Sequence, residues 1–136
     1  MFLSSSLLAL SRIAMAAMFL GLAACAAMVP IEPSVLSPAP SASAVARFQF
    51  EREVTIKLST GYQRTLAARS TWQRVGRIPQ GEVYRPLDTL LTIEGRNVHE
   101  AYLVVNGTTL VGFYLPGESN YSPLTPPQTL PTGVTQ

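Results

Sequence analysis

The chain has 136 residues, and its ten lysine or arginine residues against eight aspartate or glutamate residues leave a net charge of +2. So thin a positive excess, without a basic cluster, argues against a nucleic-acid partner. One cysteine excludes an internal disulfide, and one histidine leaves little material for a catalytic or metal-binding cluster. We therefore expect a non-enzymatic protein without a metal or another cofactor.

Residues 1–24 have the parts of a secretory signal peptide: the lone cation Arg12, an apolar run and small residues at the end. The stretch Leu22-Ala23-Ala24-Cys25 resembles the lipobox of bacterial lipoproteins, whose cysteine is acylated after the signal is cut in front of it. The resemblance implies palmitate or a similar lipid on Cys25. In that family an aspartate after the cysteine usually retains the protein in the inner membrane. Ala26 therefore implies an outer-membrane lipoprotein, and we expect its domain to face the periplasm.

Two other interpretations of this segment stay open. The first is an uncleaved transmembrane helix: the apolar stretch from Ile13 to Ala24 has 12 residues, fewer than the ~20 that a bilayer needs, but the residues before it are also fairly apolar. The second is an ordinary cleaved signal in which Cys25 plays no part.

A tether is predicted for residues 25–46. This segment is rich in proline, alanine and serine, carries a single charge at Glu32, and cannot build a packed core. Its ~20 residues would span on the order of 25 Å as a coil and up to ~65 Å when stretched. We therefore expect the domain to stand clear of the lipid headgroups.

The domain itself is predicted at residues 47–124. In residues 47–58 the apolar side chains fall at even positions, which indicates one half-buried strand or two strands around a bulge. Arg52 interrupts this alternation, so that either a bulge turns it outward or it lines a pocket.

Further short strands are predicted at residues 62–66, 70–78 and 82–85, whereas residues 87–91 fit either one helical turn or the start of a strand. Turn signals recur roughly every ten residues. We therefore expect an all-β domain: a small antiparallel sheet, or a partly closed barrel, of about six or seven short strands.

Residues 98–115 predict a hairpin around the turn Asn106-Gly107. If these two residues form the loop, Leu103 faces Leu110, and Tyr114 lies on the same side. Both faces of this hairpin are apolar, so either the sheet wraps to cover both or one face binds a partner. We expect Tyr102 in the core and the face with Leu103, Leu110 and Tyr114 as the interaction surface.

The last segment, residues 125–136, contains no charge and little apolar material, which predicts a mobile tail.

Catalysis has weak support, because only Asp88 and His99 could complete a Ser-His-Asp triad and no nucleophile-elbow sequence accompanies them. His99 and Glu100 are neighbours on a predicted strand and point to opposite faces, so they cannot chelate a metal together.

Two functional hypotheses follow. The first is a lipid-anchored lipoprotein that presents a small β-domain for protein–protein contact in an envelope assembly. The alternative is a small-ligand or inhibitor-type periplasmic binding module with a pocket near Trp72 and Tyr102. A continuous exposed apolar face would favour the first hypothesis, and a concave pocket with converging polar groups would favour the second.

Overall fold

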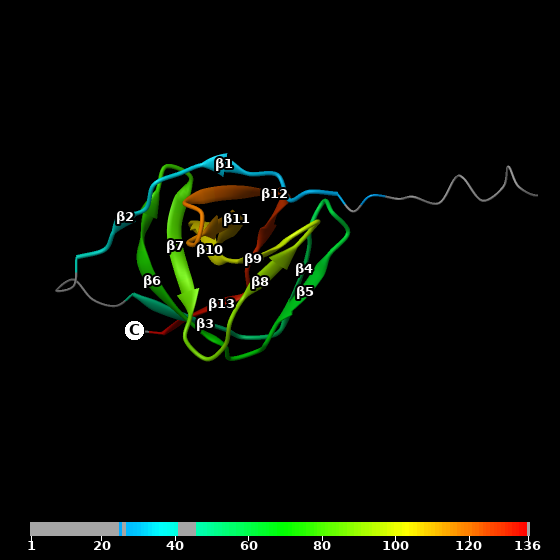
Figure 1. The fold of residues 1–136 in the computed structure, drawn as a ribbon. Helices are drawn as coiled ribbons and strands as arrows, with labels where there is room; N and C mark the ends of the chain where they lie inside the picture. The colour runs from blue at the N-terminus through cyan, green and yellow to red at the C-terminus, as the bar shows by residue number, and fades with distance from the viewer. Residues whose placement is uncertain (1–24, 26, 41–45, 136) are drawn as a thin grey trace, which may run out of the picture.

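The computed structural model describes residues 25, 27–40 and 46–135, and within these stretches every regular element is a strand (Figure 1). The predicted signal peptide, residues 1–24, lies outside the described residues. Antiparallel strands form a sheet that curls into a half-barrel, which confirms the all-β prediction.

The main sheet contains seven longer strands. In spatial order they are β12 (Asn120–Thr129), β11 (Thr109–Leu115), β10 (Tyr102–Asn106), β7 (Gly81–Pro86), β6 (Thr71–Ile78), β3 (Arg47–Phe50) and β13 (Thr132–Thr135). Two hairpins stand beside this sheet: β4 (Val54–Lys57) with β5 (Gln63–Leu66), and β8 (Thr92–Glu94) with β9 (Val98–Glu100). Two strands of two residues each, β1 (Glu32–Pro33) and β2 (Ser37–Pro38), pair with β12 and β6.

The alternation in residues 47–58 builds the main core. Phe48, Phe50, Val54 and Ile56 are all buried, although the first two lie on β3 in the main sheet and the others on β4 in a separate hairpin. Between them the chain turns outward, and Arg52 is exposed. The alternation is interrupted at Arg52 because the chain leaves the main sheet there and enters the β4–β5 hairpin. Arg52 does not line a cavity of about 350 Å³ or one of about 220 Å³ in this domain.

Trp72 of β6 lies at the centre of this core and is 1% exposed. Its ring stacks on Phe48 with the centroids 6.4 Å apart and meets Phe50 edge-on at 5.8 Å. The indole N–H donates to the Ser70 hydroxyl at 3.0 Å, so the one polar group of this buried side chain has a partner.

The predicted register of the β10–β11 hairpin is wrong. Asn106 pairs with Thr109, so the loop is Gly107-Thr108, and Gly107 alone of the tip residues has a positive φ, +64°. This is the position that a type II′ turn reserves for glycine. A bulge at Val111 then shifts the pairing once more, so that Tyr102 faces Tyr114.

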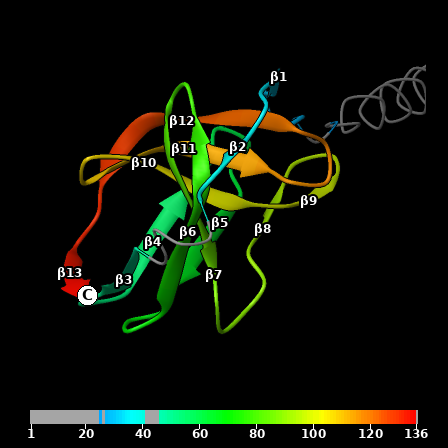
Figure 2. The ribbon, with the colours of Figure 1, turned by 90° about the vertical axis from the view of Figure 1, so that its left-hand side faces the viewer.

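Residues 27–39, which we call the strap, are not the free linker that their composition predicts. Glu32 pairs with Tyr121 at one edge of the sheet, and Ser37 pairs with Arg77 at another. Between these two contacts the strap crosses one face of the sheet, in front of β12 and β11 in Figure 2. Backbone pairing of this kind requires no alternation of side chains, which is why composition misses it.

The strap closes a second core on that face. The buried residues of this second core are Ile78, Val83, Val104, Tyr114 and Tyr121, with Leu36, Val75, Tyr102 and Val111 partly buried against them. Gly76 makes room for the strap, because a Cβ atom there would lie 2.3 Å from the carbonyl oxygen of Ser37. Both faces of the β10–β11 hairpin are thus covered within the chain.

The expected mobile tail is also paired with the sheet. β12 continues to Thr129, Leu130 is buried, and β13 pairs with β3. Pro126 and Pro127 fall in the part of β12 that has no ladder partner on β11, where the missing N–H group costs nothing. Of the predicted tail, only residue 136 lies outside the described residues.

Candidate functional site

The candidate lipid-attachment residue, Cys25, is exposed and lies two residues before the first residue of the strap. The strap begins at the turn between β8 and β9: a Cβ atom on Gly95 would lie 2.6 Å from the carbonyl oxygen of Ala27 and 2.8 Å from the nitrogen of Val29. Val29 is buried in the main core. Both ribbon views show the strap starting beside this turn (Figures 1 and 2). The motif residues Leu22, Ala23 and Ala24 lie outside the described residues.

The predicted interaction surface is not formed. Leu103 and Leu110 are 0% exposed in the main core, and Tyr114 is buried in the second core on the other face of the sheet. The bulge at Val111 separates Tyr114 from the two leucines, and the strap covers its face. Tyr102, expected in the core, is partly exposed at the edge of the second core, with its ring 6.4 Å from that of Tyr114.

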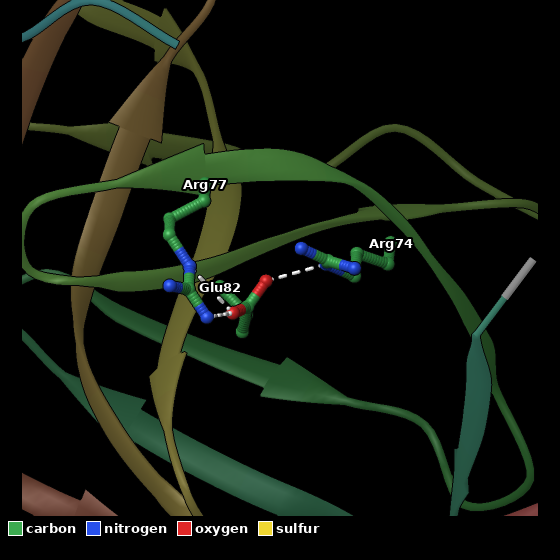
Figure 3. A network of polar contacts seen from close by, with 3 residues as sticks. All are labelled: Arg74, Arg77 and Glu82. Atoms are coloured by element: carbon green, nitrogen blue, oxygen red, sulfur yellow. Dashed lines mark hydrogen bonds and ion pairs between the residues drawn. The ribbon is translucent and has the colours of Figure 1, made fainter. Parts of the chain in front are cut away.

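A charged cluster occupies the β6–β7 hairpin, whose two-residue turn is Pro79-Gln80. The carboxylate of Glu82 accepts a hydrogen bond from Arg77 Nε at 2.8 Å and another from Arg74 (Figure 3). Burial alone would raise the pKa of Glu82, but the hydrogen bonds and positive charges of Arg77 and Arg74 outweigh it and lower that pKa. Counting back from the turn would have placed Arg77 opposite Glu82, so this pair could have been found in the sequence.

A cavity of about 350 Å³ lies beside this cluster, between the β6–β7 and β10–β11 turns. Arg77, Gln80, Glu82 and Asn106 contribute to its lining. The side-chain oxygen of Gln80 is buried without a hydrogen-bond partner in the described part of the chain, while its amide nitrogen donates to Glu32 at 3.1 Å. Polar groups thus converge on this hollow, and neither Trp72 nor Tyr102, near which a pocket was expected, lines it.

A second, smaller cavity of about 220 Å³ does reach Trp72. Leu66, Trp72 and Leu91 form its apolar floor, and Leu90, which is 57% exposed, stands at its rim. Arg64 Nη2 holds the backbone there by donating to the carbonyl oxygen of Leu90 at 3.1 Å. A volume this small suits one apolar side chain better than a drug-sized ligand. Tyr102 takes no part in its lining.

The residues considered for catalysis are held by separate partners. His99 Nδ1 lies 2.5 Å from a carboxylate oxygen of Glu118, whereas Asp88 accepts a bond from the backbone N–H of Thr71 at 3.4 Å. Among the residues that the structure describes, no group of three or more His, Cys, Asp or Glu side chains could hold a metal ion. Over the same residues, no helix has the length and apolar character required to span a bilayer.

Comparison with known proteins adds no relative: no protein-family model, no curated protein and no solved structure matches the chain.

Proposed function

We propose that this chain is a non-enzymatic lipoprotein, anchored through Cys25 in the bacterial outer membrane, whose β-domain contacts other envelope proteins on the periplasmic side. One observation carries the proposal: the tetrapeptide Leu22-Ala23-Ala24-Cys25 follows a signal-like apolar run and ends at a cysteine that is exposed. Two acyl chains carried on that sulfur, with a third on the amine that cleavage of the signal frees, would hold the protein stably on a membrane.

The cavity beside Trp72 supports contact with a protein. Leu90 is exposed at the rim of an apolar hollow that fits a single side chain, and hollows of this kind receive the anchoring residues of a partner. Leu90 is left uncovered by the rest of the described chain, and it is one of five large apolar side chains that are exposed in the described residues.

Replacing the cysteine tests the anchor. In Cys25→Ser cells we expect no incorporation of labelled palmitate and loss of the protein from the outer-membrane fraction. The matched control is Ala27→Ser, an exposed change two residues further on that should label and fractionate as the wild type does. If Cys25→Ser protein is still acylated and remains in the outer membrane, the anchor proposal is wrong.

A photo-crosslinking amino acid tests the protein contact. Placed at Leu90 in living cells it should yield a discrete larger product, whereas the same residue at Val35, which is 81% exposed on the strap, should not. Equal products at both positions, or none at Leu90, would argue against a partner at this cavity.

The hollow beside Arg77 favours a second candidate function, binding of a small polar ligand. Its support is the buried and unpaired oxygen of Gln80 together with the adjacent guanidinium group. Ligand-observed NMR with a panel of small carboxylates and sugars should detect binding that Arg77→Met weakens. Binding that is unchanged in Arg77→Met would remove this candidate.

A further inference from the structure

The packed strap shortens the link between Cys25 and the domain. Only residue 26 separates Cys25 from Ala27, whose carbonyl oxygen lies against Gly95 in the β8–β9 turn. Two residues span at most ~7 Å, so a lipid on Cys25 would enter the bilayer within roughly 10 Å of this turn. The stand-off expected from a free tether is therefore lost while the strap is packed.

The surface around that point combines exposed apolar and cationic side chains. Met28 is 57% exposed, and Val98, which pairs with Glu94 just behind the turn, is 63% exposed. Arg96 is exposed at the tip of the same turn. Ile31, two residues beyond the buried Val29, is 48% exposed. Three of the five large apolar side chains exposed in the described chain therefore lie on or next to this stretch: Met28, Ile31 and Val98, with Val35 and Leu90 elsewhere.

A neighbouring turn broadens this surface. The hydroxyl of Thr60 in the β4–β5 turn donates to the carbonyl oxygen of Glu94 at 3.0 Å, so the tips of the two hairpins lie together. Lys57 ends β4 just before this turn and adds a second exposed cation to that of Arg96. The negative charges of Glu94 and Glu100 are equal in number to these two positive charges. Apolar side chains flanked by cations are the composition that settles into the headgroup region of a membrane.

We propose that the β8–β9 turn, together with Met28 at the start of the strap, is the membrane-facing surface of the domain and rests directly on phospholipid headgroups. This inference depends on the proposed lipid at Cys25, which fixes the bilayer as the occupant of the surface. The opposite end of the hairpins, at the β5–β6 turn, then faces away from the membrane, into the periplasm.

Quenching of tryptophan by brominated lipid tests this orientation. The lipid-modified protein is reconstituted into phosphatidylglycerol–phosphatidylethanolamine vesicles with brominated acyl chains, as wild type, as Val98→Trp and as Ala68→Trp. Ala68 is exposed in the β5–β6 turn, and wild type reports the background from the buried Trp72. We expect the tryptophan at position 98 to lose about half of its added emission, as a side chain at headgroup depth would, and the one at position 68 to lose none.

Hydrogen exchange of the unsubstituted, lipid-modified protein gives an independent reading. On vesicles, amides 95–98 should exchange more slowly than in the Cys25→Ser protein in solution, and amides 67–70 should exchange at equal rates. Equal quenching at positions 98 and 68, or unchanged exchange at 95–98, in a protein whose acylation is verified by mass would overturn the orientation and leave the anchor intact. A mass without acyl chains would overturn the anchor, and with it the orientation.

Discussion

The two faces of the main sheet are covered in different ways. On one face most of the large apolar side chains come from the strands, and Leu103, Leu110 and Phe113 belong to the same buried cluster as residues of β3 and the β4–β5 hairpin. On the other face the cover is the strap, which contributes little more than Leu36 and its backbone. The first cover is side-chain packing, and the second is chiefly backbone pairing at two sheet edges.

This difference shows which segments of the fold the alternation of apolar and polar residues can predict. A strand that buries one face must alternate, so the main core is visible in the sequence. A segment that pairs over only two residues at a time has no such requirement, and proline is tolerated in it. A proline-rich stretch that precedes a domain can therefore be part of the fold.

The largest expected loss of stability comes from the main core, and comparing it with a substitution in the strap tests the contrast between the two faces. Leu110→Ala leaves a cavity in the main core and should lower the free energy of unfolding by about 3–4 kcal/mol, whereas Leu36→Ala, in the thinner cover, should cost about 1 kcal/mol. Urea denaturation of the Cys25→Ser protein measures both. Equal losses of unfolding free energy would mean that Leu36 stabilises the fold as much as Leu110 does. The two faces would then not differ in the way described.

Particular residues show what the sequence could predict. The alternation from Phe48 to Ile56 predicted buried strands, and these are buried. The Asn106-Gly107 pair predicts a hairpin here, but the register depends on whether both residues or Gly107 alone take a positive φ, and an Asn-Gly pair leaves that choice open. The predicted register contains no bulge at Val111, although Gly112 follows this residue and glycine in a strand often marks a bulge.

The candidate sites were less predictable than the fold. The Cys25 motif is local, so the sequence shows it whole. The surface expected from Leu103, Leu110 and Tyr114 is not formed for two reasons. The two leucines are buried in the main core by segments distant in the chain, and the strap covers the other face, which carries Tyr114. The hollow beside Arg77 is built from two turns that are distant in the chain, and only the folded chain brings them together.

Gly76→Ala should break the strap's cover without touching the main core. The added Cβ atom would lie 2.3 Å from Ser37 O, so β2 must move away, at an expected cost of about 2 kcal/mol. Hydrogen exchange at the amide of Ala39, which is bonded to Val75 O at 3.0 Å, should accelerate. The matched control is Gly117→Ala, where a Cβ atom meets nothing within 4 Å and both quantities should stay unchanged. A slow Ala39 amide in Gly76→Ala would show that the strap does not depend on this close approach.

Glu82→Gln should have a smaller effect that depends on pH. Because the pKa of Glu82 is lowered in the folded protein, its charged form stabilises the fold above the unfolded carboxyl pKa of about 4.3, and this contribution is lost as the pH falls through the folded pKa. At pH 7 we expect a loss of about 1 kcal/mol, because Arg77 is largely exposed and its bonds are screened by solvent. Melting curves of the variant and the wild type should converge in acid. The matched control at pH 7 is Glu100→Gln, on an exposed side chain of β9, which should change stability by less than about 0.5 kcal/mol. A loss that persists unchanged in acid would show that the charge of Glu82 is not its cause.

The smallest expected effect is that of Asn106→Ala, at the β10–β11 tip, which belongs to neither cover. Gly107→Ala places a side chain at a φ of +64° and should cost about 1 kcal/mol through backbone strain alone, because a Cβ atom there meets nothing within 4 Å. Asn106→Ala should change stability by less than about 0.5 kcal/mol, since Asn106 is not at positive φ and is exposed. A turn with both residues at positive φ would instead make the two substitutions comparably costly, so their ratio decides between the observed register and the one expected from the Asn-Gly pair. Neither substitution should alter exchange at Ala39, because the strain at the tip is local while the strap is held at the sheet edges.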